Sequence, residues 1–246
     1  MDGLVEKKYK NKIVIVTGAS SGIGKEIANF FLMNDAQVIV CSRRLHLMKI
    51  NFKKYKNVFF FKLDLTKQHE VNKLVNFVKK KFNKVDILIN NAGNAYCAPI
   101  ENISRKTLQK AFDINFFNPL FLTKEILKLM KKNNYGRIIN ISSGGAINCE
   151  KNYLSYSSTK AALNTLTKTL SKEITKKNIK VNSMSPGPCK TRMFPKNKLD
   201  PSKCLQTLDY LASLKKSGYS GKYFTFMKKI EIFPNLKSKK IQKKVI

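Results

Sequence analysis

The sequence of 246 residues is poor in signals for metal sites and disulfides. It has two histidines, without a His-Glu-x-x-His pair, and five scattered cysteines, without a Cys-x-x-Cys pair. Neither a zinc site nor a disulfide framework is therefore predicted. We expect free or buried thiols and no metal chemistry.

The sequence also lacks a run of about 18 apolar residues, so no membrane span is expected. Residues 1–9 do not form the apolar core of a signal peptide. From these two absences we expect a cytoplasmic protein that does not bind a membrane.

Acidic residues are scarce. The sequence has 15 Asp and Glu against 48 Lys and Arg, which gives a formal net charge of +33. Such an excess attracts polyanions such as nucleic acids. However, the basic residues are mostly lysines spread along the chain, and aromatic residues do not interleave with them as in a platform that stacks bases. The densest basic cluster lies in residues 237–246, which we expect to be a frayed tail. We predict non-specific polyanion binding at low salt and no specific nucleic-acid site.

Strand-like and helix-like stretches alternate along the chain. The β-branched run at residues 13–17 is typical of a strand buried on both faces. Further strands are predicted at residues 37–41, 58–63, 85–89, 136–141, 179–184 and 222–226. A helical stretch at residues 104–132 contains Pro119, where we expect a break or kink. The pattern predicts an α/β fold with a doubly wound parallel sheet of about seven strands, helices on both faces, and one domain over residues 1–246.

Glycine or polar residues follow these strands, at the edge where open α/β sheets bind ligands. The pattern Gly18-x-x-x-Gly22-x-Gly24 lies between the first strand and the next helix. Glycines allow a tight turn there, and the N-terminus of the helix attracts a pyrophosphate. This loop is a candidate nucleotide site.

The same loop also matches the Gly-x-Ser-x-Gly nucleophile elbow of hydrolases, with Ser20 as the nucleophile. A hydrolase of that fold needs an acidic residue and then a histidine downstream. Both His46 and His69 come too early in the chain, so this alternative is set aside.

Tyr156 and Lys160 are spaced i and i+4 on a predicted helix, so they share one face. A free phenol has a pKa near about 10, and a nearby ammonium lowers it. Such a tyrosine can exchange a proton with a carbonyl or alcohol oxygen. On spacing alone, the two residues are more typical of a common surface pair, and only the other motifs of the chain favour the catalytic interpretation.

Taken together, these motifs resemble the short-chain dehydrogenase/reductase family, which has the Rossmann fold. The matching residues follow the family's order over residues 13–191, and Ser143 precedes Tyr156 by thirteen residues, as is usual there. They are Thr17-Gly-x-x-x-Gly-Ile-Gly24, Asp64, Asn90-Asn-Ala-Gly93, Asn115, Ser143, Tyr156-x-x-x-Lys160, and Pro186-Gly187 with Thr191.

The resemblance implies four catalytic residues. Tyr156 would be the acid/base, Lys160 would lower its pKa and hold the nicotinamide ribose, and Ser143 would hydrogen-bond the substrate oxygen. Asn115 would hold a water in the proton relay behind Lys160, although it could instead cap or bend its helix. Ser142 is the neighbouring alternative to Ser143.

The resemblance also implies a dinucleotide site, with Asp64 and Leu65 near the adenine. Ser42 stands where an NAD enzyme would have Asp, and Arg43 can contact a phosphate. We therefore favour NADP(H) over NAD(H). The expected cofactor-binding residues are Gly18, Ser20, Ser21, Gly22, Ile23, Gly24, Arg43, Asp64, Leu65, Asn91, Ala92, Gly93, Tyr156, Lys160, Pro186, Gly187 and Thr191.

The substrate is less well indicated. It would be bounded by residues 95–96, 144–153 and 189–199, with Tyr153 assigned to the substrate loop or to packing. Residues 192–200 can form only a short loop, and the last predicted strand is not followed by the Asp-Gly-Gly of many 3-oxoacyl carrier-protein reductases. That departure weakens this substrate class, which stays the runner-up.

We expect an NADP(H)-dependent oxidoreductase that acts on a carbonyl or a secondary alcohol. The alternative from another class is a catalytically idle NADP(H)-binding protein. The family resemblance also suggests a homodimer or homotetramer, built partly on the helices that carry Asn115 and Tyr156.

Overall fold

The structure is a computed structural model that describes residues 7–175 and 177–233, so the predicted basic tail at 237–246 lies outside the described residues. Its centre is an eight-stranded sheet in the order β3-β2-β1-β4-β5-β6-β7-β8. All neighbouring strands pair in parallel except β7 and β8, which are antiparallel. The strands are β1 (Ile13–Thr17), β2 (Gln37–Ser42), β3 (Val58–Lys62), β4 (Ile87–Asn90), β5 (Tyr135–Ile141), β6 (Asn178–Ser185), β7 (Tyr223–Thr225) and β8 (Lys228–Ile230).

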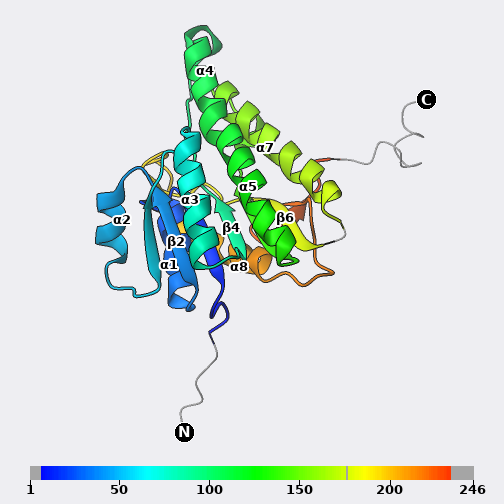
Figure 1. The fold of residues 1–246 in the computed structure, drawn as a ribbon. Coiled ribbons are helices and arrows are strands. Elements are labelled where there is room, and N and C mark those ends of the chain that lie inside the picture. Colours follow the sequence, from blue (N-terminus) through cyan, green and yellow to red (C-terminus); the bar gives the residue numbers. More distant parts are fainter. Residues whose placement is uncertain (1–6, 176, 234–246) are drawn as a thin grey trace, which may run out of the picture.

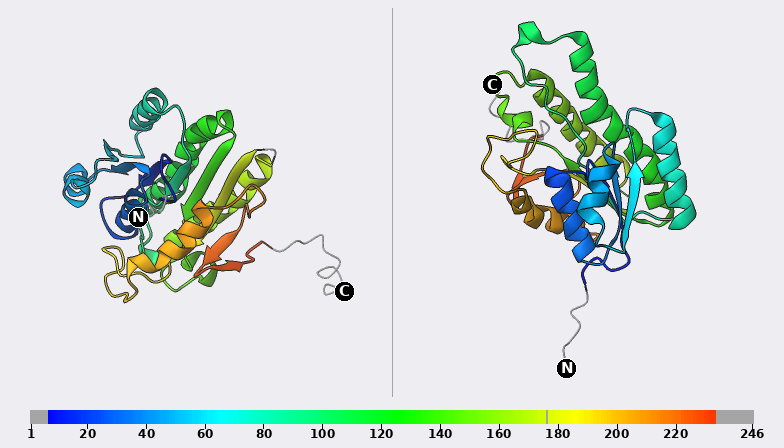
Figure 2. Two further views of the ribbon diagram at one scale, coloured as in Figure 1. Left: turned by 90° about the horizontal axis from the view of Figure 1, so that it is seen from below. Right: turned by 90° about the vertical axis from the view of Figure 1, so that its left-hand side faces the viewer.

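Helices cover both faces of the sheet, which confirms the predicted doubly wound fold (Figures 1 and 2). Helices α1, α2 and α8 contribute to the apolar cluster on one face, and α3, α5 and α7 to the cluster on the other. The helices are α1 (Gly22–Met33), α2 (Leu45–Phe52), α3 (Gln68–Lys81), α4 (Arg105–Phe112), α5 (Asn118–Lys132), α6 (Gly145–Asn148), α7 (Leu154–Glu173) and α8 (Leu205–Ala212).

The core explains why the first four residues of β1 are an uninterrupted apolar run. Its five residues are all buried, and alternate side chains enter opposite clusters. Val14 and Val16 pack with α1 and α8, while Ile13 and Ile15 pack with α3 and α5. A central strand covered on both faces has no solvent-facing side, so it needs no polar alternation.

The order in which the chain adds strands reverses between β1 and β4. Strands β2 and β3 are added on one side of β1, and β4 to β8 follow on its other side. The carboxyl ends of the strands at such a switch point form the crevice in which open α/β sheets bind ligands. The predicted glycine-rich loop follows β1, and the predicted Asn91–Gly93 segment follows β4.

The structure differs from the predicted elements in two places. The break in the long helical stretch lies in a π-helical turn at Asp113–Phe117, just before Pro119, because proline is tolerated in the first turn of α5. An eighth strand, β8, follows β7 through a tight turn at Phe226 and Met227. In the part of the chain that is described, no helix is long and apolar enough to cross a membrane.

Candidate active site

A cavity of about 1440 Å³ runs along the carboxyl ends of the strands. Pockets for one small ligand measure about 300–1000 Å³, so this cavity has room for two ligands side by side. All the predicted cofactor-binding residues line it, and so do Ser143, Tyr156 and Lys160. Asn115 is buried and does not line it, and neither do the predicted Ala95 and Tyr96.

The glycine-rich loop forms one end of the cavity. Gly18 and Gly22 have φ values of 67° and 56°, in the left-handed region that favours glycine. A Cβ atom on Gly18 would lie 2.9 Å from the Asn91 side-chain nitrogen. The turn and the close approach of the β4 loop therefore both require glycine at Gly18.

Thr17 and Asn91 fasten this loop to the end of β4. The Thr17 hydroxyl accepts hydrogen bonds from the backbone N–H groups of Asn91 and Ala92, both at 3.0 Å. The Asn91 side chain donates to the Thr17 carbonyl at 2.8 Å. The side chain of Asn91 thus connects the glycine-rich loop to the end of β4 at the base of the cavity.

Arg44, rather than Arg43, contacts the glycine-rich loop. Its guanidinium donates to the hydroxyls of Ser20 at 3.1 Å and Ser21 at 2.9 Å, and the Ser42 hydroxyl donates to Ser20 at 3.0 Å. Arg43 lines the cavity but is exposed. Burial, together with the charges of Arg192 and Arg43, lowers the pKa of Arg44 below its ordinary value. The sequence signal for this residue was the Arg-Arg pair itself, which does not say which side chain turns inward.

Asp64 lies two residues after the end of β3, and its carboxylate is hydrogen-bonded within its own loop. It accepts hydrogen bonds from the Thr66 backbone N–H at 3.1 Å and the Thr66 hydroxyl at 2.8 Å. Burial acts to raise the pKa of Asp64, but these hydrogen bonds and the charge of Arg43 hold it below its ordinary value. Asp64 is therefore an anion at neutral pH.

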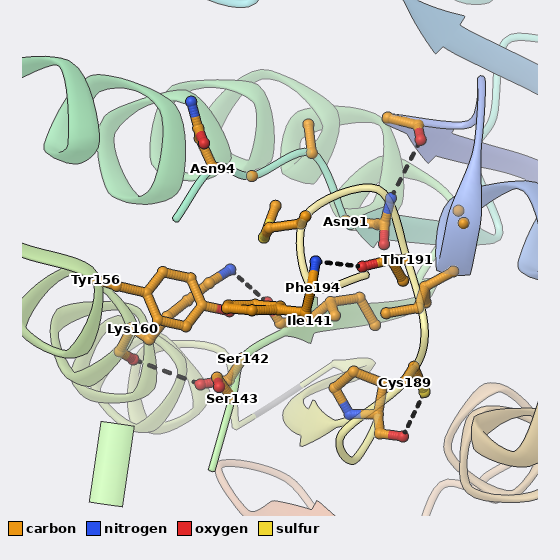
Figure 3. Close-up of a pocket in the computed structure, with 18 of the residues that line it drawn as sticks. Asn91, Asn94, Ile141, Ser142, Ser143, Tyr156, Lys160, Cys189, Thr191 and Phe194 are labelled. Carbon is orange, nitrogen blue, oxygen red and sulfur yellow. Dashed lines mark hydrogen bonds between the residues drawn. The ribbon is translucent and has the colours of Figure 1, made fainter. Parts of the chain in front are cut away.

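At the other end of the cavity, Tyr156 and Lys160 project from α7 on the same side as Ser143, which follows β5 (Figure 3). Tyr156 is 6% exposed and Lys160 is 4% exposed. The Lys160 ammonium donates to the Ile141 carbonyl at 2.8 Å. Ser142 is buried beneath, where its hydroxyl meets the Lys160 carbonyl at 3.5 Å, so Ser143 is the better placed of the two serines.

Burial sets the acidity of this pair. It raises the pKa of Tyr156 to about 12, although a hydrogen bond with Ser143 works in the opposite direction. Burial also lowers the pKa of Lys160 to about 8. Burial therefore opposes the lowering of the Tyr156 pKa that the resemblance assigns to Lys160, whose ammonium is hydrogen-bonded to the Ile141 carbonyl, and that role stays a prediction.

Asn115 lies in the π-helical turn behind this pair. Its side chain accepts a hydrogen bond from the Asn94 backbone N–H and donates to the Asn94 carbonyl, both at 2.8 Å. It also donates to the Thr159 hydroxyl at 3.0 Å, and Thr159 lies on α7 between Tyr156 and Lys160. A Cβ on Gly93 would lie 3.1 Å from Asn115 Oδ1 and 3.4 Å from Lys160 Nζ, so these two atoms flank the same small space.

A family model described as short chain dehydrogenase matches residues 12–201, well over half of the chain. The chain belongs to the short-chain dehydrogenase family. It is 34% identical over 184 residues to the 7alpha-hydroxysteroid dehydrogenase of Escherichia coli, covering 73% of this chain and 72% of that protein. It is 31% identical over 208 residues to an uncharacterized oxidoreductase of Staphylococcus aureus, covering 81% and 90%.

A solved structure of ElxO with NADP bound is similar to this short-chain dehydrogenase. The TM-score is 0.80 at 30% identity, and the match covers 87% of this chain and 96% of that one. The parallel sheet is thus the Rossmann fold that the sequence predicted, and the chain is an oxidoreductase of this family.

Proposed function

We propose that the chain is one catalytic domain that transfers hydride between NADP(H) and a carbonyl or secondary alcohol. The observation that carries this proposal is the meeting of Tyr156, Lys160 and Ser143 in the cavity that begins at the glycine-rich loop. Family membership supports it, as does the NADP bound to the similar protein ElxO.

The first turn of α1 fits the diphosphate of a dinucleotide. The side chain of its N-cap residue, Ser21, makes no capping hydrogen bond, and the turn contains no acidic residue. The backbone N–H groups at the start of this 12-residue helix are thus left for an anion. A Cβ on Gly22 would come within 3.3 Å of the Thr191 side chain and would narrow this space.

Different residues around the cavity would bind different parts of the cofactor. The loop from Gly18 to Gly24 would hold the phosphates, and Asp64 and Leu65 would lie near the adenine. Lys160 would hold the nicotinamide ribose, and Pro186, Gly187 and Thr191 would hold the nicotinamide end. When bound, the cofactor supplies or accepts the hydride.

Tyr156 acts as the acid in carbonyl reduction. With a pKa of about 12, its phenol is protonated at neutral pH and holds the proton that the product needs. As hydride adds to the carbonyl carbon, the π bond breaks and the oxygen takes the Tyr156 proton. Ser143 donates a hydrogen bond to the same oxygen, where negative charge develops.

Lys160 and Asn115 support proton transfer by Tyr156. The Lys160 ammonium stabilises the phenolate that remains after proton transfer. Asn115 Oδ1 faces the same space as Lys160 Nζ, beside Gly93, and we assign to this space the water of the proton relay. The hydrogen bonds from Asn115 to Asn94 and Thr159 fix the position of this relay.

NADP(H) is favoured over NAD(H) because Arg44 and Arg43 face the end of β2 and no acidic residue follows that strand. A guanidinium binds a phosphate with charge-assisted hydrogen bonds, whereas a carboxylate at this point would repel it. The contact of Arg44 with Ser20 and Ser21 places its guanidinium against the nucleotide loop.

Self-association is also part of this proposal. A row of phenylalanines runs along the π-helical turn and α5, with Phe117 and Phe121 stacked at 6.3 Å between ring centroids. Phe121 is 44% exposed. Phe116 and Phe117 beside it are partly exposed. Apolar side chains that reach the surface together in this way favour a homodimer through α5, and sedimentation of the purified protein would give its mass.

The test is NADPH oxidation at 340 nm with a panel of aldehydes, ketones and 3-oxoacyl thioesters, with Tyr156→Phe alongside. Tyr156→Phe keeps the ring and removes the proton, so we expect a loss of at least about 100-fold in kcat with NADPH binding retained. Wild-type protein that binds NADPH tightly but reduces no carbonyl would favour the idle alternative. Preference for 3-oxoacyl thioesters would establish the runner-up substrate class.

A further inference from the structure

Three aromatic rings meet at the substrate end of the cavity. Tyr153 and Phe194 lie parallel, with an interplanar angle of 6° and 6.1 Å between ring centroids. Both rings meet Tyr156 edge to face, at 6.1 Å and 72° for Tyr153 and at 6.0 Å and 66° for Phe194. At 6.1 Å the parallel pair is an offset stack, which leaves part of each ring face free for another ring. In Figure 3, Phe194 lies directly beside the ring of Tyr156.

The loop that carries Phe194 is held in place by its own hydrogen bonds. The Lys190 backbone N–H donates to the Leu199 carbonyl at 2.7 Å and so closes the loop. Within it, the Phe194 N–H donates to the Thr191 hydroxyl at 3.2 Å, and the Thr191 N–H donates to the Phe194 carbonyl at 3.3 Å. These hydrogen bonds hold the Phe194 backbone in place, which lowers the entropic cost of binding a ligand against its ring.

The opening of the cavity around these rings is apolar. Ile147, Met193 and Phe226 line it while remaining 40%, 39% and 51% exposed. Exposed apolar side chains gathered around a cavity mark a binding site for apolar groups. The charged residues nearby, Glu150, Lys151 and Arg192, are exposed at the rim.

We propose that Tyr153 and Phe194 form a subsite for an aromatic ring of the substrate, and that the substrate is an aryl ketone or aldehyde. This inference rests on the proposed function, because Tyr156 must meet the reacting oxygen. Both rings of the subsite are centred within 6.1 Å of the Tyr156 ring. We therefore place the substrate's ring close to the carbonyl carbon that reacts.

The test compares acetophenone with cyclohexyl methyl ketone, two ketones of similar size of which one has an aromatic ring. The wild type, Phe194→Leu and the matched control Phe194→Tyr are assayed with NADPH. Stacking is worth about 0.5–1.5 kcal/mol beyond burial, so we expect the aryl-to-cyclohexyl ratio of kcat/KM to fall about 2- to 12-fold in Phe194→Leu. It should stay within about 2-fold in Phe194→Tyr, which keeps the ring. Intrinsic reactivity cancels, because the same two ketones are compared in each variant.

A binding measurement decides the question without turnover. Calorimetric titration of the NADPH complex with 1-phenylethanol and 1-cyclohexylethanol should give tighter binding of the aryl alcohol, and Phe194→Leu should abolish the difference. An aryl-to-cyclohexyl ratio that Phe194→Leu leaves unchanged in both measurements would overturn the aromatic subsite while the proposed function stands. Failure of the wild type to bind NADPH would overturn the proposed function and this inference with it.

Discussion

Replacing Lys160 with methionine should stabilise the protein at neutral pH while it abolishes activity. Lys160 is 4% exposed, and within residues 7–175 and 177–233 its ammonium has one hydrogen bond, to the Ile141 carbonyl at 2.8 Å. Burial lowers its pKa from 10.5 to about 8, so below pH 8 the folded protein must bury a charge. At 1.36 kcal/mol for each pKa unit, this costs about 3 kcal/mol. Losing the hydrogen bond to Ile141 costs about 1 kcal/mol, which leaves a gain of about 2 kcal/mol for Lys160→Met at pH 7.

The sign of the pH dependence follows from the direction of the pKa shift. Because the pKa of Lys160 is lower in the folded state, the unfolded state binds more protons between about pH 8 and pH 10.5. Wild-type stability therefore rises with pH through this window relative to Lys160→Met, and the advantage of the variant shrinks. All other titrating groups are shared by the two proteins, so their contributions cancel in the difference.

Urea unfolding of both proteins at pH 7, 8, 9 and 10 measures this difference. Lys172→Met is the matched control, because Lys172 is exposed on the same helix, and it should change the free energy of unfolding by less than about 0.5 kcal/mol at every pH. The reasoning is refuted if Lys160→Met is less stable than the wild type at pH 7, or if the difference between them is constant from pH 7 to pH 10.

Two other substitutions test the nucleotide loop and the last turn of the sheet. Arg44→Ala should raise the dissociation constant of NADPH by about 10-fold or more and that of NADH by less than about 2-fold, because a charged hydrogen bond to phosphate is worth about 1.5–3 kcal/mol. Equal losses for both cofactors in a fluorescence titration would contradict this assignment. Met227 has φ 63° and is 38% exposed. Met227→Gly relieves a left-handed conformation that costs about 1–2 kcal/mol and adds about 0.5–1 kcal/mol of unfolded-state entropy, so thermal unfolding should show a net gain of about 0.5–1 kcal/mol. A lower unfolding temperature for Met227→Gly than for the wild type would contradict this prediction.

The sheet was predictable where burial imposes a pattern. Strands β1 and β4 are buried along their whole length because helices cover both faces, and their apolar runs, which end at Thr17 and Asn90, stand out in the sequence. Strand β8 has no such signal, since it is three residues long and two of them are exposed lysines. The position of the helix break was missed because Pro119 is compatible with the first turn of α5, and no residue pattern marks the π-helical turn before it.

The residues that line the cavity were predictable because parallel strands end at one edge, so that motifs distant in the sequence meet there. What the sequence did not resolve depends on side-chain direction and burial. The Arg43-Arg44 pair gave no indication that Arg44 turns toward Ser20. The spacing of Tyr156 and Lys160 shows that they share a face but says nothing about the desolvation that governs their acidity.

The pairing of Tyr153 and Phe194 at the substrate end of the cavity was only partly predictable. Tyr153 and Phe194 both fall in segments expected to bound the substrate, but they lie 41 positions apart on different elements, and no spacing rule pairs them. Their parallel arrangement depends on the closed loop between Lys190 and Leu199.

The central claim is that hydride passes between the nicotinamide and a carbonyl carbon with Tyr156 as the proton donor. The most direct test is mass spectrometry of the alcohol formed from NADPH that carries deuterium at both C4 positions, using wild type and Tyr156→Phe. We predict one deuterium on the carbinol carbon of the wild-type product and little or no product from Tyr156→Phe. An unlabelled alcohol, or equal labelled product from Tyr156→Phe, would contradict the account.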